Sequence, residues 1–375
     1  MNNKTLTKKR LMVAALLALP LCWGMAPAYA QDGVMRGAVL LGQSTALTGP
    51  AAALALPFAQ GAKLYFDRVN ASGGINGREI RVSTLDDAGN PATTAANTKN
   101  FLATGVLALF GYYGSPQVTA AYDSIKDSDL MLFAPMAAAD ELRGALYPNV
   151  YSMRPGYSEE AAAITKHAET LGMRRLAIVH AKDAESLAAL ESAERTMTSL
   201  GANLLAKVPL EGVDKAIAAK PESVLIISDF KGAAVAVQSL RAKGYRGPIY
   251  GFSNTGESLL ADQLGSAGAG VVVARVTPKS DNAKSVVVRE LQADAAAAKL
   301  GKPNVYMLEG YLAARAFAEG LRKAGKEPTR ARLRKAIDAM ADVDLGGFRV
   351  HFSGDRVGSK LVELSLIDSQ GRIRE

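Results

Sequence analysis

The sequence predicts an α/β protein with two similar lobes, each an open, mainly parallel sheet flanked by helices. Apolar runs of strand length alternate with helical patterns along most of the chain, which is typical of βαβ units. The same layout occurs twice. Without the leader described below, 375 − 30 = 345 residues remain. That length exceeds what one hydrophobic core usually serves, so two lobes are expected.

The first thirty residues have the pattern of an export signal. Lys4, Lys8, Lys9 and Arg10 form a positive start, and the apolar run that follows ends at Leu21 and is too short to span a bilayer. The small residues around Tyr29 then offer a cleavage site between Ala30 and Gln31. We therefore expect export through a cleaved signal to the periplasm.

Cys22 is the only cysteine, and it lies within this leader. Pro20 and Leu21 precede it where a lipoprotein signal requires small residues, so lipidation is not favoured. The exported chain would have no cysteine and no disulfide.

The charge balance of the exported chain is modest. Four of the 44 lysines and arginines leave with the leader, so 40 remain against 36 acids, a balance of +4. This charge is spread along the chain and forms no concentrated basic patch of the kind that nucleic-acid binding needs. No later segment is apolar and long enough to cross a membrane, so we expect no membrane insertion after signal removal.

Ten apolar runs read as strands, five in each half. In the first half they are Ala38–Gly42, Ile80–Leu85, Val106–Phe110, Leu130–Ala134 and Val150–Met153. In the second half they are Arg175–His180, Leu204–Val208, Val224–Ser228, Ile249–Phe252 and Val271–Val276.

The helices between these strands have recognisable ends. Asn90 and Ser115 each precede a proline and are expected as N-caps, while Gly172, Gly201 and Gly244 are expected to end helices. After Val276 the alternation stops. Three successive helices are expected at Lys284–Lys299, Pro303–Lys323 and Thr329–Met340, and then a hairpin-like pair of strands at Phe348–Phe352 and Leu361–Ile367.

The stretch from Gly42 to Pro91 reads GQSTALTGPAAALALPFAQGAKLYFDRVNASGGINGREIRVSTLDDAGNP. It closely resembles the opening of solute-binding proteins of the Leu/Ile/Val-binding family, and the resemblance extends over essentially the whole chain after the leader. The resemblance implies a two-lobed type I periplasmic-binding-protein fold with three crossings between lobes, at Met153–Gly156, Ala274–Pro278 and Asp344–Arg349. The first lobe would then comprise residues 31–154 plus 278–344, and the second 155–277 plus 345–375.

The resemblance also implies a function. Proteins of this family capture a small solute between the lobes, close over it and deliver it to the membrane permease of an ABC importer. A carboxylate-bearing solute is expected, either amino acid-like or an aromatic or aliphatic acid. A ligand-sensing protein of the same fold (amide-sensor-like, or the partner of a membrane sensor) and an exported enzyme remain alternatives.

We expect no cofactor, no metal and no catalysis, and a monomer whose partners are the solute and the permease. The three histidines, His167, His180 and His351, lie far apart, and no G-x-S-x-G motif occurs.

Candidate ligand contacts in the first lobe follow its strands. The loop Leu47-Thr48-Gly49-Pro50 would direct free N–H groups into the cleft, and Leu54 lies one turn further on. After the third strand come Tyr112, Tyr113 and Ser115. The resemblance implies that the Ser115 hydroxyl holds a ligand carboxylate, while a plain N-cap is the alternative.

The loop after the fourth strand contains Met136, Ala137 and Ala138, and the resemblance implies backbone contacts to the ligand there. Ala138 stands where amino-acid-binding members have a threonine hydroxyl. Asp140 reads as a helix cap.

In the second lobe, Ser253 and Asn254 stand where relatives of α-amino-acid specificity have an acid for the ammonium group. Glu185 or Asp229 could replace that acid, or each could be a solvated loop residue. The missing acid argues against an ordinary zwitterionic ligand, because an unpaired buried ammonium costs several kcal/mol. Aromatic residues at cleft-facing positions, or alternatively in the core, are Tyr157, Phe230 and Tyr306.

Overall fold

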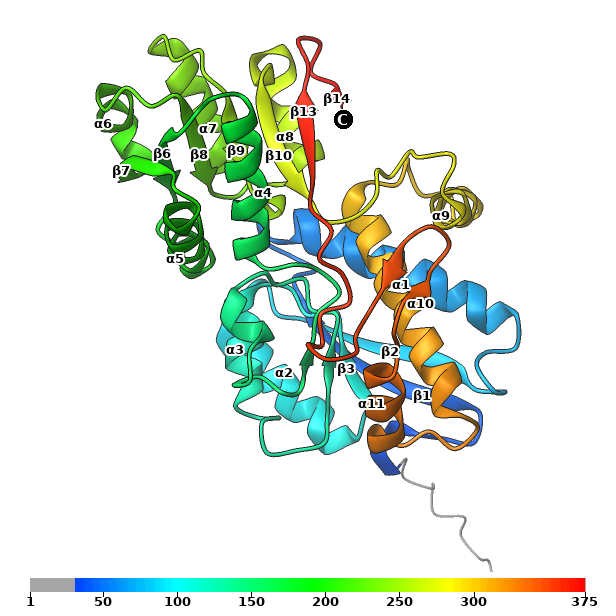
Figure 1. Ribbon diagram of the computed structural model, residues 1–375. Helices are drawn as coiled ribbons and strands as arrows, with labels where there is room; N and C mark the ends of the chain where they lie inside the picture. The colour runs from blue at the N-terminus through cyan, green and yellow to red at the C-terminus, as the bar shows by residue number, and fades with distance from the viewer. Residues whose placement is uncertain (1–30, 375) are drawn as a thin grey trace, which may run out of the picture.

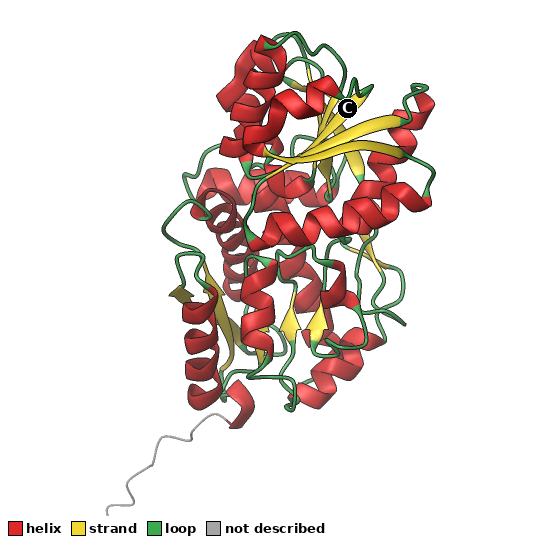
Figure 2. Ribbon diagram, turned by 90° about the vertical axis from the view of Figure 1, so that its left-hand side faces the viewer, coloured by secondary structure: helices red, strands yellow, loops and turns green. Residues whose placement is uncertain are grey.

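The computed structural model describes residues 31–374, which form two lobes with a main sheet in each (Figures 1 and 2). The expected signal segment and Ala30 lie outside the described residues. The first sheet has the order β2-β1-β3-β4-β5, and all its strands are parallel. These strands are β1 Ala38–Thr45, β2 Glu79–Asp86, β3 Ala108–Phe110, β4 Leu132–Phe133 and β5 Val150–Tyr151.

The second sheet has the order β14-β13-β10-β9-β8-β6-β7 and is parallel except for its last two strands in sequence, β13 and β14. Its strands are β6 Arg175–His180, β7 Asn203–Pro209, β8 Ser223–Ile227, β9 Ile249–Gly251, β10 Val271–Arg275, β13 Glu363–Ile367 and β14 Ile373–Arg374. The predicted α/β class and all ten predicted strands are confirmed.

Helices cover both faces of each sheet, and buried residues on both faces form separate cores. In the first lobe, α1, α9, α10 and α11 pack on one face and α2 and α3 on the other; in the second, α6, α7 and α8 pack opposite α4 and α5. The first-lobe helices are α1 Ala52–Ala71, α2 Pro91–Thr104, α3 Ser115–Tyr122, α9 Val286–Ala297, α10 Val305–Ala324 and α11 Arg330–Asp338. The second-lobe helices are α4 Tyr157–Thr170, α5 Ala184–Ser199, α6 Val213–Ala218, α7 Phe230–Ala242 and α8 Glu257–Leu264. Short 3₁₀ turns lie at η1 Gln31–Gly33, η2 Asp140–Arg143, η3 Leu210–Gly212, η4 Ser253–Thr255 and η5 Gly265–Gly268.

Two glycines allow α1 and α10 to cross in direct backbone contact. A Cβ added at Gly61 would lie 1.9 Å from the carbonyl oxygen of Met307, and one at Gly310 would lie 1.9 Å from that of Phe58. No side chain fits at these distances, so the close approach of the two long helices requires glycine at both positions.

The predicted helix ends are largely confirmed. Asn90 caps α2 by accepting hydrogen bonds from the backbone N–H groups of Ala92 and Thr93. Gly172, Gly201 and Gly244 follow the ends of α4, α5 and α7 in the left-handed backbone region that favours glycine.

The predicted terminal hairpin is wrong. The short strand β12 (Arg349–Val350) pairs with β11 (Val343–Asp344), whereas β13 pairs with β10 and β14 in the second sheet. Phe348, Val350 and Phe352 are buried in the first-lobe core. The apolar alternation of this segment therefore reflects burial in the first lobe and not pairing with β13.

The third crossing consequently lies later than the expected Asp344–Arg349. After Phe352 the chain runs beside the end of β5, where Ser152 donates its backbone N–H to Arg356 and accepts from the N–H of Gly358. It then enters the second sheet at β13, as the red segment of Figure 1 shows. The expected start of the second lobe's last segment at residue 345 is therefore too early.

Candidate functional site

A cavity of about 520 Å³ lies between the two lobes, and we call it the interlobe cavity. Its walls come from the loops that follow β1 to β5 in the first lobe and β6, β8 and β9 in the second. Open parallel sheets bind ligands at these carboxyl ends of their strands. The residues that line it are Pro50, Ala51, Leu54, Ala88, Gly89, Pro91, Tyr113, Gly114, Pro116, Gln117, Met136, Ala138, Arg154, Tyr157, Asp183, Ala184, Glu185, Asp229, Phe230 and Asn254.

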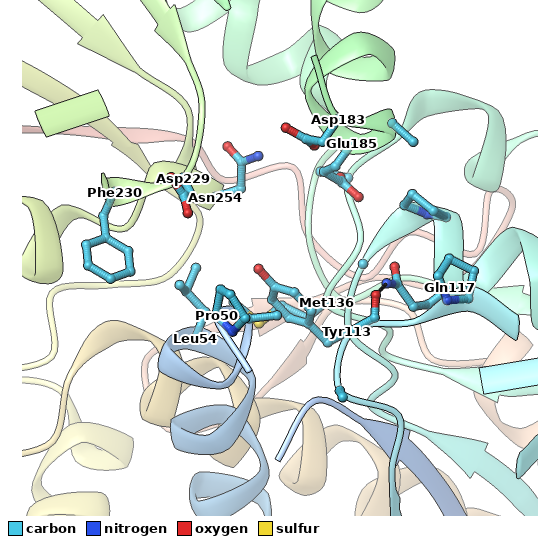
Figure 3. Close-up of a pocket in the computed structure, with 18 of the residues that line it drawn as sticks. Pro50, Leu54, Tyr113, Gln117, Met136, Asp183, Glu185, Asp229, Phe230 and Asn254 are labelled. Carbon is cyan, nitrogen blue, oxygen red and sulfur yellow. Dashed lines mark hydrogen bonds between the residues drawn. The ribbon is translucent and has the colours of Figure 1, made fainter. Parts of the chain in front are cut away.

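The two sides of the cavity differ in chemistry (Figure 3). The second lobe presents Asp183, Glu185, Asp229 and Asn254 on one side, with Phe230 beside them. The first lobe presents a largely apolar side. Its labelled residues are Pro50, Leu54, Tyr113, Met136 and Gln117.

Ser115 does not cap its helix as expected. Gly114 occupies the N-cap position of α3, and Ser115 is the first helical residue, without a side-chain cap bond. Its hydroxyl instead donates to Glu185 Oε1 at 2.8 Å and accepts from the backbone N–H of Ala139 at 3.1 Å.

The carboxylate that Ser115 binds is therefore one from the protein itself. The backbone N–H of Ser115 donates to Glu185 Oε2 at 2.6 Å, and the hydroxyl of Tyr157 donates to Glu185 Oε1 at 2.5 Å. Burial and the nearby carboxylate of Glu185 raise the pKa of Tyr157 well above its ordinary value, so its hydroxyl keeps the proton that it donates. The donor set that the sequence assigned to a ligand is occupied by Glu185 of the opposite lobe.

Arg154 is a buried cation at the cavity wall that the sequence analysis did not identify. It lies 3.5 Å from Glu160 and 3.4 Å from Glu309, and both acids are buried. Burial alone would lower the pKa of Arg154, but Glu309 and Glu160 together raise it above its ordinary value. In the sequence, Arg154 could have been noticed because it precedes Pro155 in a predicted crossing between the lobes.

Ser253 lies behind this ion-pair group rather than on the cavity wall. Both its backbone N–H and its hydroxyl donate to Glu160 at 2.7 Å, and its hydroxyl also accepts from Arg154. Burial raises the pKa of Glu160, while Arg154 and the two bonds from Ser253 counteract that rise. Position 253 has no acid of its own, and Ser253 instead binds Glu160, a buried acid of α4.

Arg143 fixes the loop after β4 to the first crossing between lobes. Its guanidinium donates to the carbonyl oxygens of Ala137 and Ala139 at 2.8 Å and of Pro155 at 2.9 Å. Burial, together with the neighbouring cation Arg154, lowers the pKa of Arg143 to about 10. The carbonyl of Ala137 is therefore already engaged.

Asp140 caps a helix, as the sequence suggested, although the helix is not its own. Its Oδ1 accepts from the backbone N–H of Ser158 in the first turn of α4 at 3.1 Å. Its other oxygen accepts from the Ser158 hydroxyl and pairs with Arg195.

Asp86 organises the loop after β1. Its carboxylate accepts from the backbone N–H groups of Leu47 at 2.9 Å and Thr48 at 3.3 Å, and from the Thr48 hydroxyl at 2.6 Å. The Thr48 hydroxyl, with the backbone N–H groups of Ala88 and Leu47, lowers the pKa of Asp86 to about 2. The expectation that free N–H groups of this loop point into the cleft is wrong for Leu47 and Thr48.

The structure divides the expected site residues into two groups. Those on the cavity wall are Leu54, Tyr113, Met136, Ala138, Tyr157, Glu185, Asp229, Phe230 and Asn254. Those behind the wall are Tyr112, Ser115, Ala137, Ser253 and Tyr306.

Each residue of the second group has a structural environment of its own. The hydroxyl of Tyr112 shares a hydrogen bond with Thr98 at 3.0 Å inside the core. Tyr306 is buried beside Ser253 and Glu309, and its hydroxyl has no hydrogen-bond partner within residues 31–374.

Two acids of the second lobe begin helices. Asp229 caps α7 by accepting from the N–H of Gly232 at 2.8 Å, and Asp183 caps α5 by accepting from that of Ser186 at 2.9 Å. Both acids also line the cavity, so each one caps a helix and faces the cavity at the same time. Sequence analysis did not single out Asp183, although a short polar residue before a helix is a recognisable signal.

The comparisons with known proteins agree with this architecture. A model of the family described as "Periplasmic binding protein" matches residues 38–360. The Leu/Ile/Val-binding protein BraC3 of Rhizobium johnstonii is 24% identical over 335 residues, which cover 87% of this chain and 86% of that protein.

Solved structures show the same fold. An extracellular ligand-binding receptor from Verminephrobacter eiseniae superposes with a TM-score of 0.84 at 24% identity, covering 90% of this chain and 100% of that one. A substrate-binding periplasmic protein from Ralstonia solanacearum has a TM-score of 0.82 at 28% identity, covering 89% and 99%. Within residues 31–374, no helix has the length and apolar character needed to span a bilayer. The match to the family model shows that the chain belongs to the periplasmic binding protein family.

Proposed function

We propose that this chain is the exported substrate-binding component of an ABC importer. It captures a small solute in the interlobe cavity and delivers the closed complex to a membrane permease. The observation that carries the proposal is the cavity itself, whose volume lies in the range of small-molecule sites and whose walls come from both lobes. Family membership and the names of the relatives support a solute-binding role.

Closure would couple binding to delivery. The lobes are joined by short segments, and Glu185 of the second lobe accepts a hydrogen bond from Ser115 of the first lobe. A solute that contacts both walls would add interactions only in the closed form and shift the population toward it. The permease would then recognise the closed shape.

The expected carboxylate on the ligand is not part of this proposal, because it rested on the donors of Ser115. Those donors bind Glu185. We also propose that the role is in transport and that the solute is not chemically converted.

The test begins with the full chain expressed in a Gram-negative host and purified from the periplasmic fraction. Intact-mass measurement should give a chain beginning at Gln31. Native mass spectrometry would reveal any retained solute, and thermal-shift screening of amino acids, amines, aromatic acids and dicarboxylates would find others. A solute that raises the melting temperature, compacts the protein in X-ray scattering and is recovered unchanged supports the proposal. Chemical conversion of the solute by the purified protein would contradict it.

A further inference from the structure

We propose that the solute carries a positively charged group, such as an ammonium or amidinium, on an apolar or flat body, and that Glu185 selects it. This inference rests on the proposed function, since it names the ligand class of the same cavity. It differs from the carboxylate ligand that the resemblance implied.

The charges around the cavity favour a cation. Among its lining residues are three acids, Asp183, Glu185 and Asp229, and a single cation, Arg154, with no lysine. Arg154 is already held between the buried acids Glu160 and Glu309. The three lining acids therefore outnumber the one lining cation, so the wall facing the solute has an excess of negative charge.

The helix ends reduce this excess without removing it. Asp183 and Asp229 cap α5 and α7, and the positive end of each helix dipole is equivalent to roughly half a charge. Each full carboxylate charge is therefore only partly offset. Glu185 is the second residue of α5, two positions after Asp183, and its carboxylate accepts a hydrogen bond from Ser115 across the cavity.

Glu185 also excludes an anion from the place where one would be expected. Both its oxygens are bound: Oε1 accepts from the hydroxyls of Ser115 and Tyr157, and Oε2 accepts from the N–H of Ser115. A ligand carboxylate would have to displace Glu185 from all three donors. It would then remain beside the displaced carboxylate, and two like charges at such a distance repel.

The opposite wall suits the body of the solute. Leu54 and Met136 present apolar surface, and Tyr113 adds an aromatic ring that faces the second lobe (Figure 3). Phe230 lies on the acidic side. Aromatic faces attract cations as well as apolar groups, so a cationic head on an apolar body would match both walls.

The test compares matched ligands on the purified protein after removal of any retained solute by unfolding and refolding. The probes are phenethylamine, 3-phenylpropanoate and the uncharged 3-phenylpropanamide, with a panel of shorter and longer aryl and alkyl amines. Calorimetry should show that the best amine binds at least about tenfold tighter than its matched carboxylate, with an affinity that weakens as salt rises.

Variants assign the selection to individual residues. Glu185→Gln should weaken amine binding at least about tenfold and strengthen carboxylate binding, because the donors of Ser115 become available. Asp229→Asn keeps a good N-cap and should also weaken amine binding. Glu194→Gln, on the same helix α5 and paired with Lys207 away from the cavity, should leave all affinities unchanged.

The outcomes separate the two proposals. If wild-type protein binds a carboxylate or neutral probe tighter than every amine and closes over it, the cationic class is overturned and the binding function stands. If Glu185→Gln binds the amine as tightly as wild type, the role of Glu185 is overturned. If no solute of the library compacts the protein in X-ray scattering, both proposals fail.

Discussion

The hydroxyl of Ser115 donates to the carboxylate of Glu185 at 2.8 Å, and these residues stand at the starts of helices in different lobes. Their contact joins α3 to α5 across the interlobe cavity, with Tyr157 as a further donor to the same carboxylate. The structure thus shows a contact between the two lobes that an internal carboxylate makes.

Replacing Ser115 by alanine should weaken this contact between the lobes. A hydrogen bond to a charged group contributes about 1.5–3 kcal/mol, so the ligand-free variant should favour the open form more than wild type does. We expect a larger radius of gyration in X-ray scattering. We also expect the affinity for the true ligand to fall clearly. The melting temperature of the ligand-free protein should change less. An unchanged radius together with unchanged affinity would contradict this role.

Leucine, isoleucine and valine should bind weakly or not at all. Ala138 lacks the hydroxyl that amino-acid-binding relatives supply, and Glu185 occupies the donors of Ser115 that would receive the ligand's carboxylate. Isothermal titration with each amino acid measures this. A dissociation constant in the low micromolar range or tighter for any of them would refute the prediction.

Removing Arg154 should destabilise the fold strongly. Arg154→Met leaves Glu160 and Glu309 buried without their cation, which typically costs about 3–5 kcal/mol near neutral pH. The pKa of both acids, already raised by burial, would rise further. An acid with a raised folded pKa keeps its stability below the unfolded pKa and loses it as pH rises through the folded value.

The deficit of Arg154→Met in urea unfolding should therefore grow from pH 5 to pH 8. The triple variant Arg154→Met, Glu160→Gln, Glu309→Gln removes all three charges and should recover most of the loss. A deficit independent of pH would show that packing, and not charge, is responsible.

Asp86 should stabilise the protein through its charge in a defined range of pH. Its folded pKa of about 2 is below the ordinary 3.8, so its contribution is present above the unfolded value and is lost as pH falls toward 2. Asp86→Asn keeps one acceptor and removes the charge. The stability difference between wild type and this variant, measured by urea unfolding, should be constant from pH 5 to 7 and shrink between pH 4 and 2. A difference that persists at pH 2 would be inconsistent with this account.

Gly310→Ala should be destabilising although alanine is the better helix former. Alanine gains about 1 kcal/mol of helix propensity, but the new Cβ would lie 1.9 Å from the Phe58 carbonyl oxygen and force α1 and α10 apart. We expect a net loss of about 1–3 kcal/mol in thermal or urea unfolding. Gly301→Ala, where no atom lies within 4 Å of the added Cβ, is the matched control and should be nearly neutral.

Much of the fold could be predicted because it depends on local patterns. The ten strands, the cap at Asn90 and the helix ends at Gly172, Gly201 and Gly244 follow from apolar periodicity and from the backbone conformations that these residues favour. This approach failed for the short strands near the C-terminus. An apolar run such as Phe348–Phe352 reports burial, and it does not report which sheet provides the partner.

Local residue patterns were sufficient to predict the α/β class, the doubled strand-and-helix layout and the loops at which a ligand site would lie. What these loops contact could be seen only in three dimensions. Ser115 and Glu185 are seventy positions apart, and each alone reads as an ordinary residue at a helix start. Their partnership depends on how the lobes close, and so does the pairing of Arg154 with Glu160 and Glu309. Charges and hydrogen bonds act over a few ångströms in space, and no local pattern in a sequence records that distance.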